Sequence, residues 1–235
     1  MSQFRILYED EWVVAVDKPS GFFTHPPEDD SHARIPKSVN GLALLRDQLG
    51  LYVYPAHRLD RATSGVLLYA KSPEAAGAFG KLFQNHQVEK TYFAFARGWM
   101  NEPITVDRPL DGKESVTEFR PAFRASLPVA VGARYSELRL TLIEAKPLSG
   151  RFHQIRRHLQ GLTHPILGDS LRGDGQSNRA FREVFPGHPM MLKCYRLAFP
   201  HPFLDQKRIV LRSRWGHEWH SVFEQIGFCG WGECQ

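Results

Sequence analysis

The chain has 235 residues, of which 42% are hydrophobic and 23% are charged, and its formal net charge is +5. This composition is typical of a globular protein, and the length allows a sizeable core without disulfides or metal. It excludes a disordered chain and a disulfide scaffold, and no run of about 20 apolar residues suggests a membrane span.

The first 50 residues predict a β-hairpin, a surface loop and a short helix. Strands are expected over residues 5–8 and 12–16, where a run of valines favours extended backbone. Residues 24–37 are polar and rich in proline, which is typical of a mobile surface loop. Leucines at helical spacing predict an amphipathic helix over residues 39–49.

An apolar strand and a capped helix are expected next. Residues 65–70 form an apolar run of strand length, and Ser72, Pro73 and Glu74 supply an N-cap, a first-turn proline and a first-turn acid. Further strands are predicted over residues 91–97, 116–124, 136–144, 192–199 and 208–212, and further helices over 153–160 and 219–226. Strands outnumber helices without regular alternation, which predicts an α+β fold with a largely antiparallel mixed sheet and flanking helices.

The charge is distributed unevenly along the chain. Residues 1–30 contain two cations and seven acids, whereas the remainder contains 28 cations and 18 acids. A basic body favours a polyanionic partner, and arginine, which binds phosphate bidentately, supplies 21 of the 30 cations. A solvated arginine-rich surface explains the same counts equally well.

The cysteines and the amino terminus indicate the cellular compartment. Cys194, Cys229 and Cys234 do not have the spacing of a zinc site or a disulfide framework. The amino terminus has no basic stretch followed by an apolar one, so no signal peptide is expected. Both features favour a reducing, cytoplasmic location.

Residues 57–65, HRLDRATSG, place one carboxylate between two guanidiniums just before an apolar strand. The neighbouring cations favour the ionised form of Asp60, and an ionised carboxylate can act as a nucleophile. A surface ion-pair turn with capping hydroxyls is the alternative, and from these residues alone it is the commoner structure.

A second segment, KPLSGRFHQIRRHL, carries four cations and no acids between Lys146 and His158. A helix that begins after a glycine is a natural anion site, and Arg156 can bind a carboxylate or phosphate bidentately. His153 and His158 are five residues apart and do not share a helix face, so we expect no metal site. A solvated basic helix is an equally good interpretation.

Two shorter segments complete the set. Tyr92, in VEKTY, either packs in the core or presents its ring to a nucleobase. The segment HPILGD, residues 164–169, predicts a structural turn, and its Asp169 competes with Asp60 for any catalytic role.

Together these segments resemble the RluA family of pseudouridine synthases. The resemblance is carried by ILYEDEWVVAVDKPSG, HRLDRATSGVLL, VEKTY, GRFHQIRRHL and HPILGD, which keep the family's order across nearly the whole chain. LFQNHQVEKTYFAFARGW and RRHLQGLTHPILGDSLRGDGQSNR resemble the members of the family that modify uridine 65 of tRNA. Ser149 and Phe152 depart from the residues usual in the family, and the stretch between Gly98 and Thr117 is short for those tRNA-modifying members.

The resemblance implies roles for particular residues. Asp60 is expected to be the catalytic carboxylate, Arg156 to pair with it, and Tyr92 to stack on the target uracil. Arg58 is expected to fill the space left by a flipped uridine, and Ile155 to pack on the other face of the base. Phosphate contacts are expected from Arg61, Lys18, Arg151 and Arg157.

We therefore expect one catalytic domain over residues 1–235, with no separate amino-terminal RNA-binding domain. The expected protein is a monomeric, cytoplasmic, cofactor-free enzyme that acts on RNA, with tRNA as its substrate. Three alternatives remain at this point: a ribosomal RNA substrate, a non-catalytic RNA-binding protein, and a hydrolase that uses Asp60 and Asp169 as a carboxylate pair. The presence of Asp60, Tyr92 and Arg156 together argues against simple RNA binding.

Overall fold

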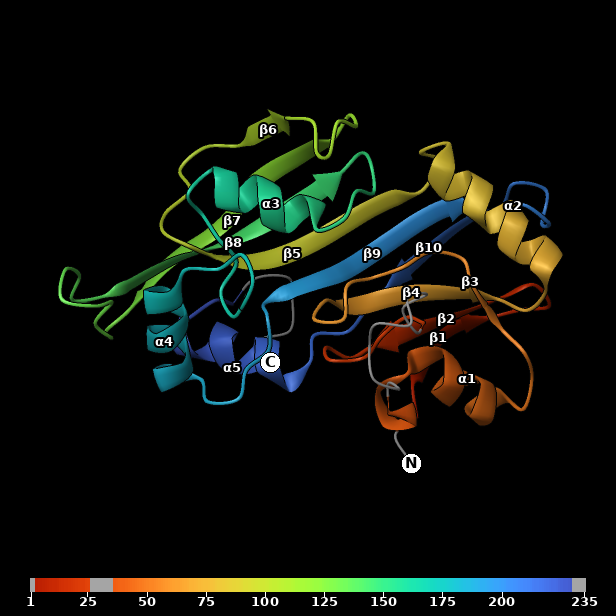
Figure 1. Ribbon diagram of the computed structural model, residues 1–235, viewed down its shortest axis with the longest axis horizontal. Coiled ribbons are helices and arrows are strands. Elements are labelled where there is room, and N and C mark those ends of the chain that lie inside the picture. The colour runs from red at the N-terminus through yellow and green to blue at the C-terminus, as the bar shows by residue number, and fades with distance from the viewer. Residues whose placement is uncertain (1–2, 26–35, 230–235) are drawn as a thin grey trace. The chain divides into compact units, whose positions relative to one another are not determined.

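The computed structural model describes residues 3–25 and 36–229 (Figure 1). Its contacts divide the chain into two compact units, each assembled from two stretches of sequence. The first unit comprises Met1–Thr91 and Lys193–Arg214, and the second comprises Tyr92–Leu192 and Trp215–Gln235. The single catalytic domain expected from the sequence stays a prediction, and most of the expected loop over 24–37 lies outside the described residues.

The first unit is built on a mixed sheet. Its strands follow the order β1 (Arg5–Glu9), β2 (Val13–Lys18), β4 (Ser64–Ala70) and β9 (Leu192–Pro200), with β3 (Tyr54–Pro55) on β4 and β10 (Arg208–Arg212) on β9. Every pair is antiparallel except β4 with β9, which is parallel. The prediction of a mixed, largely antiparallel sheet is confirmed.

Local side-chain chemistry fixes the amino-terminal hairpin. The carboxylate of Asp10 accepts the backbone amides of Trp12 and Val13 at 2.8 and 2.9 Å, which closes the turn between β1 and β2. Val13 and Val14 are fully buried in β2. The predicted hairpin is therefore confirmed, because β1 and β2 pair antiparallel on either side of this turn.

The parallel pair β4–β9 requires a glycine at its start. Gly65 has a φ of +113°, and a Cβ at this position would lie 2.1 Å from the carbonyl oxygen of Cys194 in β9. Only a residue without a side chain permits both this backbone conformation and this approach.

The described residues of the first unit include the helices α1 (Gly41–Leu49) and α2 (Pro73–Gln84), together with the 3₁₀ turn η1 (Lys37–Val39). Asn40 caps α1 by accepting the amide of Ala43 at 3.2 Å, and Ser72 caps α2 by accepting the amide of Ala75 at 3.1 Å. Both helices were predicted, and each begins where a capping side chain satisfies a first-turn amide.

The sheet of the second unit is antiparallel throughout. Its order is β5 (Glu89–Arg97), β8 (Leu138–Pro147), β7 (Val116–Leu127) and β6 (Ile104–Asp107), with a bulge between Pro121 and Phe123 in β7. Strand β6 was not predicted, since it is short and mostly exposed.

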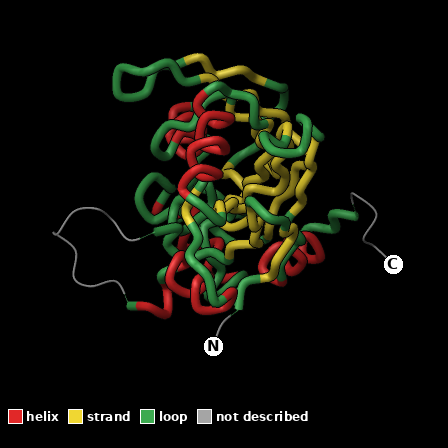
Figure 2. The backbone as a smooth tube through the Cα atoms, turned by 90° about the vertical axis from the view of Figure 1, so that its right-hand side faces the viewer, coloured by secondary structure: helices red, strands yellow, loops and turns green. Residues whose placement is uncertain are grey.

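The second unit contains α3 (Gln154–Gly161), α4 (Gly175–Val184) and α5 (His217–Gln225), drawn red in Figure 2. Helices α3 and α5 were predicted, and in α5 the ring of Trp219 stacks on Phe95 of β5 at 5.5 Å. Helix α4 was missed because its sequence, GQSNRAFREV, is mostly polar. The helix is stabilised instead by Asp174, whose carboxylate accepts the amide of Ser177 as an N-cap, and by the fully buried ring of Phe181.

Candidate functional site

The loop that carries Asp60 is anchored through its backbone on the carboxyl-terminal side of that residue. The amide of Gly21 donates to the carbonyl of Arg61 at 2.8 Å, and the hydroxyl of Ser20 donates to the carbonyl of Ala62 at 2.7 Å. The turn after β2 and the loop before β4 therefore hold each other in a fixed conformation. The segment KPSG and the segment HRLDRATSG, separated in sequence, are adjacent within the first unit.

The other side of Asp60 is anchored as well. Thr24 is buried, and its hydroxyl lies 3.1 Å from both the carbonyl and the amide of Leu59. The hydroxyl of Tyr69 donates to the carbonyl of Thr24 at 2.9 Å, and the amide of Thr63 donates to the carbonyl of Asp60 at 3.0 Å. The backbone of Asp60 is thus fixed from both directions, while its side chain remains partly exposed.

Lys18 differs from the expectation that it contacts phosphate. Only 1% of this residue is exposed, and its ammonium donates to the carbonyls of Pro19 and Phe22 at 3.0 Å and of Arg61 at 3.2 Å. An ammonium has three donors, and all three meet backbone acceptors here. In this conformation Lys18 supports the loop of Asp60 and has no surface to offer to RNA.

Lys18 also contributes to the electrostatics of Asp60. Burial lowers the pKa of Lys18 to about 7, the carboxylate of Asp60 acts in the opposite direction, and Lys193 lowers it further. The ammonium form is the one that donates to three carbonyls, and its charge attracts the carboxylate of Asp60. The two groups are therefore electrostatically coupled within the first unit.

His57, Arg58 and Arg61 surround Asp60 in sequence but differ in environment. His57 stacks on Phe83 at 4.5 Å and accepts the amide of Leu68 at 3.1 Å, and burial lowers its pKa to about 3. This ring is therefore a neutral structural acceptor. Arg58 and Arg61 are exposed, and Arg61 also donates to the carbonyl of Gly21 at 3.0 Å.

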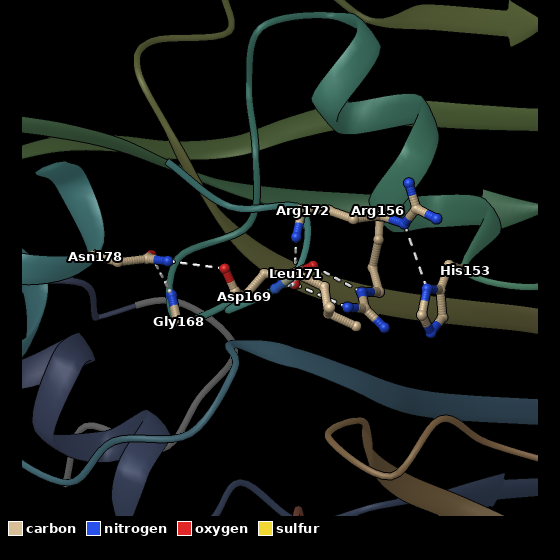
Figure 3. Close-up of polar contacts among 7 residues, drawn as sticks. All are labelled: His153, Arg156, Gly168, Asp169, Leu171, Arg172 and Asn178. Carbon is tan, nitrogen blue, oxygen red and sulfur yellow. Dashed lines mark hydrogen bonds and ion pairs between the residues drawn. The ribbon is translucent and has the colours of Figure 1, made fainter. Parts of the chain in front are cut away.

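In the second unit, Arg156 forms a buried ion pair with Asp169. Its Nε and Nη2 atoms lie 2.7 and 2.8 Å from the two carboxylate oxygens, and the side chains are 5% and 1% exposed (Figure 3). Oδ1 of Asp169 also accepts the amides of Leu171 and Arg172, each at 3.0 Å. Burial raises the pKa of Asp169, but the hydrogen bonds from Arg156 and these amides outweigh it and hold the pKa below its usual value.

The loop that follows α3 is fixed around the Arg156–Asp169 pair. Asn178 of α4 donates to the carbonyl of Asp169 at 2.8 Å and accepts the amide of Gly168 at the same distance. Asp169 is therefore fixed through both its side chain and its backbone. The segment HPILGD forms a structural turn, as the sequence indicated, and the carboxylate of Asp169 is engaged with Arg156 and two amides. This engagement weakens the hydrolase alternative.

A scan against family models matches residues 12–161 to "RNA pseudouridylate synthase". The chain belongs to the RNA pseudouridylate synthase family. The matched range contains Asp60, Tyr92 and Arg156 and ends before Asp169. The sequence resemblance to pseudouridine synthases is thereby confirmed, and the non-catalytic alternative loses its support.

Curated relatives and solved structures agree with this family. The chain is 39% identical to tRNA pseudouridine synthase C of Vibrio cholerae, over 95% of this chain and 96% of that protein. It is 37% identical to the protein of the same name from Salmonella typhi, over 96% of this chain and 91% of that one. The structure of human RNA pseudouridylate synthase domain containing 1 matches with a TM-score of 0.69 and 23% identity, over 90% of this chain and 83% of that one. Human RNA pseudouridylate synthase domain containing 4 matches with a TM-score of 0.64 and 23% identity, over 94% and 92%.

In this pseudouridine synthase, Gln154 fixes the start of α3, a role that the sequence did not reveal. Its amide oxygen accepts the hydroxyl of Ser149 at 2.8 Å and the amide of Arg151 at 3.0 Å. Its amide nitrogen donates to the carbonyl of Val116 and the hydroxyl of Thr117, each at 2.9 Å. A polar residue at the first helical position gives no sequence signal for this role, because its partners on β7 are 37 and 38 residues away.

The remaining expected site residues of the second unit lie on β5 and around α3. Tyr92 is partly exposed on β5, and Ile155 is buried. Arg151 donates to the carbonyl of Glu114 at 3.0 Å, and Arg157 forms an exposed pair with Asp111 at 2.7 Å. The structure thus gathers Asp60, Arg58, Arg61 and Lys18 in the first unit, and Tyr92, Arg151, Ile155, Arg156 and Arg157 in the second.

Neither a membrane-crossing helix nor a metal centre is found in the part of the chain that the structure describes. None of the helices over residues 3–25 and 36–229 combines the length and apolar character needed to span a bilayer. In the same ranges no three histidine, cysteine, aspartate or glutamate side chains group as metal ligands do. His158 is buried and lies 3.0 Å from the hydroxyl of Thr117, as a structural histidine.

Proposed function

We propose that this pseudouridine synthase isomerises a uridine of tRNA, with uridine 65 as the target. The observation that supports this proposal most strongly is the similarity to tRNA pseudouridine synthase C, which extends over 95% of the chain at 39% identity. The basic body and the predominance of arginine agree with a polyanionic RNA substrate. We expect the enzyme in the cytoplasm, as a monomer that meets its RNA without a metal or cofactor.

The proposed reaction is balanced within the substrate. The N1–C1′ glycosidic bond breaks, the uracil turns, and a C5–C1′ bond forms. The proton on C5 is lost, and N1 gains a proton. No electrons enter or leave, so the enzyme must supply a nucleophile or base, a rigid pocket for the base, and a path for one proton.

Asp60 is the proposed catalytic carboxylate. Attack at C1′, attack at C6 and abstraction of a proton all begin from the ionised side chain. Its support is local: the backbone is anchored on both sides, the side chain is partly exposed, and its charge interacts with that of Lys18. A fixed backbone limits the positions that the carboxylate can adopt, which is the requirement for aimed attack.

Arg156 is proposed to hold Asp60 ionised and oriented, as the family resemblance implies. The ion pair with Asp169 supports this role, because it fixes the plane of the guanidinium through Nε and Nη2 before RNA binds. Tyr92 is proposed to stack on the target uracil and Ile155 to pack against its other face. The partly exposed ring of Tyr92 agrees with such contact.

Base flipping is a physical requirement of this chemistry, since C1′ and a turning base are inaccessible within a helix. Arg58 is proposed to occupy the vacated space, which agrees with its exposure beside Asp60. Arg61, Arg151 and Arg157 are proposed to contact phosphates.

The decisive experiment replaces Asp60 by asparagine. We expect Asp60→Asn to abolish tritium release from C5-labelled uridine in tRNA, while the Kd for that tRNA stays within a few-fold of the wild-type value. Asp47→Asn is the matched control, since Asp47 is an exposed acid paired with Lys37 at 2.7 Å in the same unit. Tritium release by the Asp60→Asn enzyme would refute the assignment of the carboxylate.

Site-resolved mapping of the product tests the substrate separately. Bulk tRNA treated with the wild-type enzyme should gain one pseudouridine, at position 65. If tRNA stays unmodified while ribosomal RNA from a deletion strain lacks a pseudouridine, the tRNA proposal fails and the ribosomal alternative is correct.

A further inference from the structure

The two loops next to the Arg156–Asp169 pair expose apolar side chains to solvent. Phe152, just before α3, is 59% exposed, and Leu171, just after Asp169, is 74% exposed. A single exposed apolar residue needs no explanation, but here two occur on loops that the same ion pair holds together.

The ring of Phe152 is held in a fixed orientation. It stacks on the imidazole of His153 with a centroid distance of 3.7 Å and an interplanar angle of 21°. Arg172, from the loop of Leu171, donates through Nε to Nδ1 of His153 at 3.3 Å, as Figure 3 shows. The imidazole therefore joins the two loops and supports the phenyl ring.

The backbone at this position carries strain. His153 adopts a left-handed conformation with a φ of 54°, which costs on the order of 1 kcal/mol for a residue other than glycine. Such strain is retained only where surrounding contacts impose it, and here the hydrogen bond from Arg172 and the stack with Phe152 do so. The result is an exposed aromatic surface that is rigid before any ligand arrives.

The surroundings of this surface are cationic. Arg151, Arg157 and Arg172 lie on the same loops and helix, and Arg156 follows Phe152 by four residues in the sequence. Two of these arginines pair with acids: Arg157 with the exposed Asp111, and Arg156 with the buried Asp169. Exposed aromatic rings among arginines are typical of surfaces that bind unpaired nucleotides, because the rings stack on bases while the cations meet phosphates.

We propose that Phe152, supported by His153 and flanked by Leu171, stacks on the base next to the target uridine in the RNA substrate, on the face that flipping exposes. This inference rests on the proposed function and adds a specificity-determining contact to it. An enzyme that flips a uridine disturbs the stack of its neighbours, and the ring of Phe152 supplies a replacement surface for one of them. Leu171 covers the edge of the same surface, and the arginines attract the phosphates of that nucleotide.

A thermodynamic cycle between protein and RNA tests the stack directly. Phe152→Ala is combined with tRNA transcripts that carry an abasic site at each nucleotide flanking the target in turn. At one flanking position the abasic site and Phe152→Ala should each weaken binding roughly 5- to 100-fold, and the two together no more than either alone. Phe152→Trp should restore binding to intact tRNA, and kcat at saturating RNA should stay within a few-fold.

Controls separate this contact from folding and from other partners. Tyr52→Ala removes a 71% exposed aromatic ring from the first unit and should leave the Kd unchanged. 2-Aminopurine at the coupled position should be quenched by the wild-type enzyme and not by Phe152→Ala. Strictly additive effects at every flanking position overturn the proposal, as does a change of oligomeric state in Phe152→Ala without a change in Kd. If product mapping shows that the wild-type enzyme forms no pseudouridine in tRNA, the proposed function fails, whereas the binding cycle tests the stack alone.

Discussion

The buried pair between Arg156 and Asp169 gives a prediction with a calculable magnitude. Asp169→Asn keeps the size of the side chain but places an amide donor against the guanidinium of Arg156 and removes the carboxylate that accepts from its Nε and Nη2 atoms. Breaking a buried ion pair in this way costs about 3–5 kcal/mol. For a chain of this length the melting temperature should fall by about 2–4 °C per kcal/mol, so by roughly 6–20 °C.

The chain offers a matched control for this experiment. Arg157 and Asp111 form a bidentate pair with distances of 2.7 and 3.0 Å, but Asp111 is 67% exposed. Because solvent screens such a pair, Asp111→Asn should leave the melting temperature nearly unchanged. Urea and thermal unfolding of both variants at pH 7 measure the contrast. Equal, small effects of the two substitutions would refute the argument that burial gives the Arg156–Asp169 pair its importance.

The same pair predicts a dependence on pH. The hydrogen bonds from Arg156 and the loop amides hold the pKa of Asp169 below its unfolded value of about 3.9. The stability contributed by the ionised carboxylate is therefore complete above that pH and is lost as the pH falls through the lower, folded value. The difference in unfolding free energy between wild type and Asp169→Asn should be constant from pH 5 upward and shrink below about pH 4.

Three further predictions concern the first unit. Gly65→Ala should lower the free energy of unfolding by more than about 3 kcal/mol, because its Cβ meets the carbonyl of Cys194; near-wild-type urea unfolding would contradict this. Burial lowers the pKa of Lys18 to about 7, so the unfolded chain binds more protons from there to about pH 10, and wild-type stability should rise over that window. Lys18→Met should lack this rise, and parallel pH profiles of unfolding free energy would show the reasoning to be wrong. Arg58→Ala should weaken the 2-aminopurine signal of base extrusion beside the target while leaving the melting temperature unchanged, and an unaltered signal would count against its proposed role.

The secondary structure that the sequence predicted well was encoded locally. Ser72 and Pro73 marked the start of α2, and the structure places Ser72 as its cap. The valines of β2 and the apolar run of β4 marked strands that are almost entirely buried. Helix α4 was missed because its stability depends on one buried phenylalanine and a capping aspartate, which a periodic pattern over ten residues does not reveal.

The sequence by itself determined the family, the α+β class and the identity of the candidate catalytic residues. The order of the motifs and the chemistry of their side chains are properties of the linear sequence and need no tertiary structure. The tertiary structure alone decided how the supporting residues act. It turned Lys18 from an expected phosphate ligand into a buried support 43 residues from the carbonyl of Arg61, and it gave Arg156 a partner in Asp169, 13 residues away. Such pairings depend on which loops the sheets bring together and on how much water they exclude. Neither the pairing of the loops nor the exclusion of water is set by neighbours in the chain. Two charges interact strongly only where folding has removed the solvent around them.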